Sequence, residues 1–384
     1  MTNLLLVPFP PAGHTMPMAA LADQLRADGH AVTIFAESDT TRWGMRRPVT
    51  PQMYAQADAA ALFRHMFLGD IADMTRDIVD LASACEAELI VTDVLMPGGG
   101  LAAELAGLPW VSLSCAPIPE LDTYRYFLPD EAVASFEPRT TRQELGLPAG
   151  DDRNLLARTS DLLHLIPTTP RFAGFPELPP QVALTGPFTS VPAQEPVAGS
   201  SERPAVAVTT SSNAMGQYTL VEQRYLKAAA QALTSLGLTG LTDHDNPHQE
   251  LFSQSEAVIT HGGWGTVSRA LMLDLPLVLV PFGADQPYIA ARCADLGVGI
   301  VAPAETVTAA ELRDAIRGVI EEPSYRKAAA ELGAELRAAA PLATASSMIT
   351  ARCWPGGTTP RNPPRCWPGG TTPRNPPHSF SRTT

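Results

Sequence analysis

The sequence predicts an α/β protein with two doubly wound parallel-sheet domains. Short apolar runs of strand length alternate with segments of helical spacing, and this order is typical of parallel sheets covered by helices on both faces. The pattern stops at residues 189–204, which are rich in Pro, Ser, Gly and Glu, and then starts again. We therefore expect an N-terminal domain over residues 1–188, a linker over 189–204 and a second domain over 205–351.

Length and charge fit this class and exclude others. The chain has 384 residues, enough for two cores, and a formal net charge of −13. So acidic a protein is not expected to bind nucleic acid or anionic lipid as a bulk partner. No apolar run reaches the length of about 18 residues that suggests a membrane span, and the first residues lead straight into a strand without a basic leader. We expect a cytoplasmic protein without a membrane partner.

The first strand and the turn after it place a histidine at a sheet edge. Residues 4–7 are a continuous apolar run, residues 10–14 turn the chain, and helical spacing begins at Met16. The turn lacks the GxGxxG pattern of dinucleotide sites, so an NAD-dependent oxidoreductase is poorly supported. His14 could accept a proton near neutral pH, or it could merely cap or pack against the helix.

An acid ends a second buried strand. Residues 89–92 form an apolar run that closes with Asp93. Strand ends of one sheet edge can meet, so Asp93 could hold one nitrogen of His14 and fix its tautomer. A cap on the next helix is the alternative. Cys85, Cys115 and Cys293 stand singly in apolar contexts, and we expect core thiols rather than disulfides or a zinc pattern.

Apolar and aromatic residues gather in the loop-rich parts of the first domain. Residues 59–67 and 71–84 have helical spacing, whereas 117–148 is irregular and aromatic. These residues could line a pocket for a hydrophobic ligand, or they could pack in the core. The candidates are Met53, Phe63, Met66, Phe67 and Tyr124.

The second domain offers an anion site after a buried strand. Residues 257–260 are followed by the turn His261-Gly262-Gly263-Trp264-Gly265-Thr266 and then by a helix. Glycines let the backbone approach a ligand, and a helix N-terminus presents unpaired N–H groups, so phosphate is the natural ligand. A tight structural connection is the alternative. Ser211, at the end of the strand expected from residue 205, suits diphosphate oxygens or a local backbone bond.

A carboxylate and an amide follow the next strand. Residues 277–280 are apolar, and the turn after them ends in Asp285 and Gln286. Open α/β sheets bind ligands at the carboxyl ends of their strands, so both side chains are candidates for a ligand contact.

At these motifs the chain resembles a known family. Residues 261–266, 281–286, 290–292 and 296–299 are similar in order and spacing to the family 1 glycosyltransferases of the GT-B fold, particularly the bacterial enzymes that attach deoxysugars to polyketides and other natural products. The resemblance spans about residues 3 to 350. It implies inverting transfer from a dTDP- or UDP-sugar donor to a hydrophobic small-molecule acceptor, with no metal and no cofactor. A homodimer would be compatible with it.

The resemblance also implies roles for the residues above. His14 would be the general base for the acceptor, with Asp93 as its partner, and Asp285 and Gln286 would bind the donor sugar. The donor diphosphate would lie at His261, Gly262, Gly263, Gly265, Thr266 and Ser211; the acceptor would contact Met53, Phe63, Met66, Phe67 and Tyr124.

Two regions depart from the family pattern. After the helix predicted over 223–236, no apolar strand is expected before Ala257, where the family has two further strands and an aromatic residue that stacks on the base. This gap leaves open an impaired paralogue, or a non-catalytic activator of another glycosyltransferase. A sugar-nucleotide epimerase or hydrolase is another enzymatic alternative within the fold.

The chain ends in a tandem repeat. Residues 352–364 recur unchanged at 365–377 with four prolines per unit, which predicts a disordered tail over 352–384, or else a docking tail. The family usually ends with a helix that crosses back onto the first domain, and after Met348 and Ile349 the sequence shows no clear candidate for it.

Overall fold

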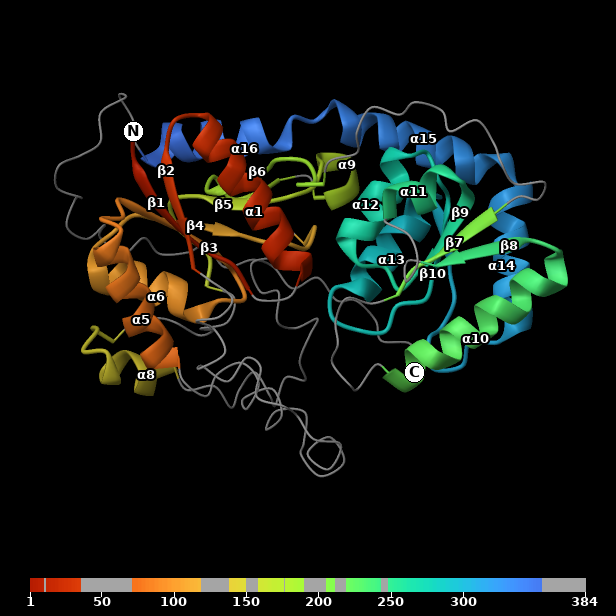
Figure 1. The fold of residues 1–384 in the computed structure, drawn as a ribbon, viewed down its shortest axis with the longest axis horizontal. Coiled ribbons are helices and arrows are strands. Elements are labelled where there is room, and N and C mark those ends of the chain that lie inside the picture. Colours follow the sequence, from red (N-terminus) through yellow and green to blue (C-terminus); the bar gives the residue numbers. More distant parts are fainter. Residues whose placement is uncertain are drawn as a thin grey trace.

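Two parallel β-sheets, each covered by helices on both faces, form the structure (Figure 1). The computed structural model describes residues 1–9, 12–35, 71–118, 138–149, 158–175, 177–189, 205–210, 219–242 and 248–353. The predicted α/β class with two doubly wound parallel sheets is confirmed.

Six strands of the described chain form the N-terminal sheet, in the order β2-β1-β3-β4-β5-β6. All of its pairings are parallel. Leu4, Leu5, Leu6 and Val7 are buried on both faces, which explains why the strand reads as a continuous apolar run. The strands are β1 (Asn3–Val7), β2 (Ala31–Ile34), β3 (Leu89–Asp93), β4 (Trp110–Leu113), β5 (His164–Ile166) and β6 (Val182–Leu184).

Side chains that alternate along β1 divide between two helix layers. Leu4 and Leu6 pack with α1 and α16, whereas Leu5 and Val7 pack with α5 and α6. The helical spacing at Ile71 to Ala84 is confirmed as α5. The helices of this part are α1 (Ala12–Ala27), α5 (Ile71–Ala84), α6 (Pro97–Ala106), α8 (Pro138–Glu144), α9 (Pro170–Ala173) and, from the end of the chain, α16 (Pro341–Cys353).

The C-terminal sheet has five strands within the described residues, in the order β11-β10-β9-β7-β8, again all parallel. Val206 and Val208 face one apolar core, and Ala207 faces the other. The strands are β7 (Ala205–Val208), β8 (Thr239–Thr242), β9 (Ser255–Thr260), β10 (Leu277–Leu279) and β11 (Gly299–Val301).

Helices cover this second sheet on both faces. One core lies under α10 and α14, and the other under α11, α12, α13 and α15. Among the described residues, no helix combines the length and apolar character needed to cross a membrane. The helices are α10 (Thr219–Leu236), α11 (His248–Ser253), α12 (Trp264–Met272), α13 (Gln286–Asp295), α14 (Ala309–Glu321) and α15 (Pro323–Ala338).

The strand order reverses once in each sheet. In the first sheet β1 lies between β2 and β3, and in the second β7 lies between β8 and β9. Connections leave in opposite directions at such a point, which opens a crevice at the carboxyl ends of the strands. The sequence candidates His14 and Asp93 follow β1 and β3, and His261 follows β9.

The last described helix crosses back to the first sheet, and Met348 and Ile349, after which the sequence shows no candidate for such a helix, lie within it. Helix α16 lies beside α1 over the N-terminal sheet (Figure 1), where Ala345 and Ile349 join the core and Ser346 donates a hydrogen bond to Asp28 at 2.5 Å. Its many Ala, Ser and Thr residues hide the apolar stripe in the sequence. We propose that the two domains span residues 1–188 and 205–351, with a linker over 189–204. Helix α16, at the end of the second range, packs on the first domain.

The expectation that no strand lies between residue 236 and Ala257 was wrong, because the polar segment Thr239–Thr242 forms β8. Strand β8 pairs with β7 as the edge of the second sheet, although Thr239 and Thr242 are polar. An edge strand is only half covered, so it needs no apolar run. Gly240 allows helix α10 to lie close, since a Cβ there would come within 2.9 Å of Leu233.

Candidate active site

His14 lies in the first turn of α1, which begins earlier than the sequence predicts, at Ala12. Its Nδ1 is 2.8 Å from Oδ2 of Asp93, at the end of β3. The Asp93 side chain is fully buried, whereas 23% of the His14 side chain remains exposed. The imidazole therefore bonds to a buried carboxylate on one side and is open to a ligand on the other. The contact expected between these two residues is present.

The Asp93 carboxylate is fixed from two further directions. Its Oδ1 accepts a hydrogen bond from the backbone N–H of Leu95 at 2.8 Å. Its Oδ2 also accepts a hydrogen bond from Sγ of Cys115 at 3.2 Å. Asp93 is not the cap of helix α6, because the N-cap position belongs to Met96.

Cys115 was expected in the core and lies instead at this sheet edge. It is half-buried and follows β4, the neighbour of β3. The rule that singles out Asp93, a position at the carboxyl end of a buried strand, would have singled out Cys115 as well. Its apolar neighbours in the sequence concealed the site. Cys85 is half-buried too, and Cys293 is a core thiol as predicted.

Burial and charged residues of both domains change the pKa values of His14, Cys115 and Asp285. Burial alone would lower the pKa of the His14 imidazole, but the charge and hydrogen bond of Asp93, together with the charge of Asp285, raise it above its usual value. Burial raises the pKa of Asp285 to about 6, against the opposing effect of His14. Burial and the charge of Asp93 raise the pKa of the Cys115 thiol. The charge of Asp285, at the start of α13 in the second domain, therefore acts on the His14 site of the first.

A second histidine near Asp93 is unsuited to proton transfer. His164 is 3% exposed, and its Nδ1 bonds to Oγ of Ser112 at 2.9 Å. Burial lowers the pKa of His164 to about 4. It is neutral at physiological pH and enclosed by the sheet, which leaves His14 as the base within reach of a ligand.

The glycine turn after β9 ends at the N-terminus of α12. Gly262 has a φ of +95°, which favours glycine, and Gly263 is the N-cap residue. Helix α12 begins at Trp264, so Gly265 and Thr266 lie in its first turn. The first N–H groups of a helix have no acceptor inside the helix. A Cβ at Gly265 would meet no atom within 4 Å, so the backbone is open to a ligand there.

His261 packs against the turn that it opens. The residue is 6% exposed, and its ring stacks on Phe282 with 5.7 Å between centroids. A Cβ at Gly263 would come within 2.9 Å of its Nε2, so this position requires glycine. Sequence reasoning missed Phe282, whose ring also meets Tyr225 at 5.7 Å.

Asp285 and Gln286 stand at the start of α13 and differ in what their side chains do. Asp285 occupies the N-cap position without a side-chain capping bond. The Oε1 of Gln286 accepts hydrogen bonds from the N–H groups of Phe282 at 2.8 Å and Gly283 at 3.2 Å. The oxygen of Gln286 therefore holds the turn, and the residue is 4% exposed.

Several predicted site residues lie outside the described residues. They are Ser211 of the diphosphate set and the whole acceptor set, Met53, Phe63, Met66, Phe67 and Tyr124. The repeat tail lies outside them from residue 354 onward.

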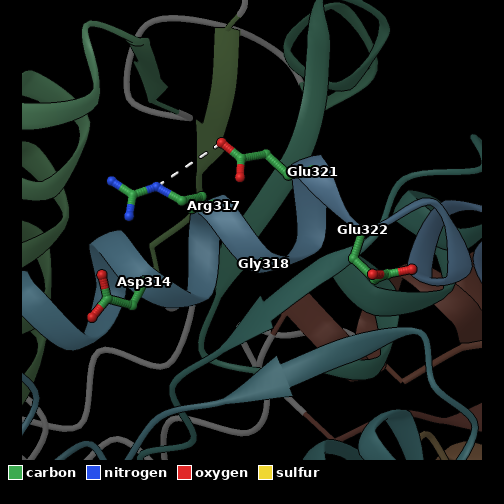
Figure 2. Close-up of a pocket in the computed structure, with 5 residues that line it drawn as sticks. All are labelled: Asp314, Arg317, Gly318, Glu321 and Glu322. Carbon is green, nitrogen blue, oxygen red and sulfur yellow. Dashed lines mark ion pairs between the residues drawn. The ribbon is translucent and has the colours of Figure 1, made fainter.

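A hollow on α14 is a different feature. Figure 2 shows Asp314, Arg317, Glu321 and Glu322 along this helix, with Arg317 Nε 4.0 Å from Glu321 Oε1. Three acids and one base repel a diphosphate, and the hollow is not at a strand end. It is therefore not a donor site.

Comparison with known sequences finds relatives of this chain. Residues 243–349 match the family described as "Erythromycin biosynthesis protein CIII-like, C-terminal domain". The 4'-demethylrebeccamycin synthase of Lentzea aerocolonigenes is 27% identical over 406 residues, which covers 88% of this chain and 96% of that protein. The vancomycin aglycone glucosyltransferase of Amycolatopsis orientalis is 40% identical over 86 residues, or 22% and 21% of the two chains.

Solved structures share the fold. The glycotransferase of kitacinnamycin has a TM-score of 0.69 at 19% identity, covering 91% of this chain and 98% of its own. Spinosyn rhamnosyltransferase SpnG complexed with thymidine diphosphate has a TM-score of 0.64 at 22% identity, covering 91% and 100%.

The chain has the GT-B fold of these glycosyltransferase structures. In sequence it is similar to the EryCIII-like C-terminal domain over residues 243–349, and to 4'-demethylrebeccamycin synthase over 88% of its own length. The alignment with that synthase is longer than this chain of 384 residues, so the relative has residues that this chain lacks.

Proposed function

We propose that the protein is an inverting, metal-independent glycosyltransferase. It moves a sugar, such as a deoxyhexose, from a dTDP- or UDP-sugar to a hydrophobic natural-product acceptor such as a polyketide aglycone. The observation that carries this proposal is the pair formed by His14 and Asp93 at 2.8 Å, and the charge of Asp285 from the second domain also acts on this imidazole. An acceptor and a donor sugar would meet between these groups.

His14 would activate the acceptor. A hydroxyl is a weak nucleophile at neutral pH, and an imidazole in hydrogen-bond reach can take its proton as the new bond forms. With Nδ1 turned to Asp93, the Nε2 atom is the one left to accept this proton. The buried carboxylate of Asp93 would stabilise the imidazolium that results.

The donor diphosphate would lie at the start of α12. The N–H groups of the first turn, with the positive end of the helix dipole, suit the phosphate charge. His261, Gly262, Gly263, Gly265 and Thr266 lie in this turn or in the first turn of the helix and would bind the diphosphate, and Ser211, outside the described residues, would be a further contact. The structural neighbours SpnG and VinC were solved with thymidine diphosphate and dTDP respectively, which supports this choice of nucleotide.

The donor sugar would lie against Asp285 and Gln286, which follow strand β10. The Asp285 carboxylate can accept hydrogen bonds from sugar hydroxyls, and the Gln286 amide nitrogen can donate one. The acceptor would approach the anomeric carbon from the His14 side, opposite to the departing diphosphate. In-line attack of this kind inverts the anomeric configuration.

The leaving diphosphate would be stabilised by α12 and His261 rather than by a metal ion. An Asp-X-Asp triplet, a common metal-binding pattern, occurs at Asp243-His244-Asp245, outside the described residues. The transfer rate should therefore also be measured with a chelator, which tests whether a metal ion takes part in the reaction. We place the transferase above a non-catalytic activator, because a scaffold has no use for an imidazole bound to a buried carboxylate.

Product analysis tests the proposal. The purified protein would be incubated with α-linked dTDP- and UDP-sugars and a panel of hydrophobic natural-product aglycones that includes polyketides, with mass spectrometry to detect the glycoside. Nuclear magnetic resonance of the product should show a β linkage from an α-linked donor. A product that keeps the α configuration would exclude the inverting mechanism, and donor hydrolysis at an equal rate without any aglycone would favour the hydrolase.

A further inference from the structure

Three different metal-ligating side chains converge at the edge of the N-terminal sheet. The Nδ1 of His14, a carboxylate oxygen of Asp93 and the Sγ of Cys115 all lie within 4.8 Å of one another. They follow three adjacent strands, β1, β3 and β4. Among the described residues, this is the one group of three or more His, Cys, Asp or Glu side chains that converges in this way.

We propose that His14, Asp93 and Cys115 form a zinc-binding site whose occupation switches the enzyme off. A thiolate, an imidazole and a carboxylate are the ligands that zinc takes in proteins, and three protein ligands leave a fourth position for water. The site shares His14 and Asp93 with the proposed base, so the switch rests on the proposed function, whereas metal binding itself does not depend on which sugar or acceptor is used.

The distances fit such a site after small movements. Zinc lies about 2.0–2.3 Å from its N, O and S ligands, which sets neighbouring ligand atoms somewhat more than 3 Å apart. Here the Asp93 oxygen is 2.8 Å from Nδ1 of His14 and 3.2 Å from Sγ of Cys115. The Leu95 N–H holds the other Asp93 oxygen in place, as an outer-shell partner does in a metal site. His14 is partly exposed, which gives the ion a route of entry.

The local charge favours a cation. The buried Asp93 carboxylate is part of the group, and the negative charge of Asp285 acts on both His14 and Cys115, whose pKa values it raises. A zinc ion bound to Asp93 and a Cys115 thiolate would have its two positive charges balanced by these two ligands. Asp285 would then act on the bound ion as a further nearby carboxylate.

The switch follows from the positions of the protons. In the metal-free site the imidazole proton is on Nδ1, between His14 and Asp93, and Nε2 has the free lone pair. When zinc binds Nδ1, that proton moves to Nε2, and Cys115 releases its thiol proton to solvent. One proton leaves per ion bound. Because Nε2 then carries a proton, His14 can no longer accept one from an acceptor hydroxyl.

Cobalt substitution tests the site without any substrate. Co²⁺ would be titrated into the full chain carrying Cys353→Ser and Cys366→Ser, so that thiols of the C-terminal region cannot bind it. We expect saturation at one ion per chain, a thiolate-to-cobalt absorption band in the near ultraviolet, and displacement by Zn²⁺. In the same background, Cys115→Ser should abolish the band, and His14→Asn should weaken binding at least about tenfold.

Two controls make the outcome decisive. Cys85→Ser removes a half-buried thiol outside the proposed site and should leave the band unchanged. Cys115→Ser keeps a hydroxyl that can donate to Asp93, and its circular dichroism should match that of the parent. A thiolate band that survives Cys115→Ser, or Co²⁺ binding that never saturates, would overturn the proposal. Failure of dTDP binding would affect only the proposed transferase function.

Discussion

The candidate sites at the two sheet edges use different chemical groups, side chains at one edge and the backbone at the other. At the end of β1, β3 and β4, three side chains bond to one another, with Asp93 accepting from His14 and Cys115. At the end of β9, the exposed groups are the backbone of Gly263, Gly265 and the first turn of α12. Moving a proton requires one imidazole in a fixed tautomer, whereas holding a diphosphate requires several N–H donors.

This difference predicts how each edge responds to substitution. The first edge should lose rate when a single side chain is removed, because one imidazole is the base. The second should lose donor affinity when the backbone is covered, even if no side chain is removed. The predictions below test this contrast, from the largest expected effect to the smallest.

His14→Ala should lower turnover about 10²–10⁴-fold while leaving donor affinity unchanged, because the general base is lost. Turnover would be followed by product formation, and donor affinity by calorimetry with dTDP. His30→Ala, which changes a histidine beyond the other end of α1, is the matched control. An unchanged rate in His14→Ala would remove the base assignment.

Asp93→Asn should lower turnover by up to as much as His14→Ala, because an amide no longer fixes the tautomer in which Nε2 of His14 can accept a proton. It should also shift the acidic limb of the rate profile. His14 acts as a base only when neutral, so activity falls as the pH drops through its pKa, which Asp93 and Asp285 raise. Loss of the Asp93 charge leaves burial to lower that pKa, so the limb should move to lower pH. A shift to higher pH would contradict this electrostatic account.

Gly265→Ala should weaken dTDP binding at least about tenfold, which corresponds to about 1.4 kcal/mol. Its new methyl group would meet no protein atom within 4 Å, so it should obstruct only a ligand. Alanine is favoured over glycine in a helix by up to about 1 kcal/mol, so thermal unfolding should not reveal a loss of stability.

Gly13→Ala is the matched control on the other edge. This glycine is also exposed in the first turn of a helix, and a Cβ there also meets nothing within 4 Å. It should leave dTDP binding unchanged and act only on the acceptor side. Equal dTDP affinity in Gly265→Ala and Gly13→Ala would show that the start of α12 does not bind the donor.

Chelation should have the smallest effect. EDTA should not reduce the transfer rate, because the leaving diphosphate is stabilised by α12 and His261. If the protein is isolated with zinc at His14, Asp93 and Cys115, EDTA should instead raise the rate. A rate that falls with EDTA and returns with Mg²⁺ would point to a metal-dependent reaction.

The sequence was sufficient for the fold and for the residues with distinctive chemistry. Apolar runs and glycine turns predict the two parallel sheets, and the contact between His14 and Asp93 is present. Their catalytic roles, and those of Asp285 and Gln286, stay predictions. Burial at a sheet centre leaves a strong sequence signal, and so does a polar residue at the end of a buried strand.

The features that were missed have weak signals for physical reasons. Strand β8 is a polar edge, and α16 buries small residues such as Ala345. Cys115 carries no charge, so its place beside Asp93 emerges only when β3 and β4 pair. The effect of the Asp285 charge on the pKa of His14 depends on how the two domains are placed, which no local pattern encodes.

Calorimetric titration with dTDP and UDP, with His261→Ala as the control, tests the central claim most directly. The claim is that the turn after β9 binds the donor diphosphate although the chain lacks residues present in its relative. We predict saturable binding of one of the two nucleotides at one site per chain, and its loss in His261→Ala. Absence of binding by either nucleotide, or full affinity in His261→Ala, would contradict the account.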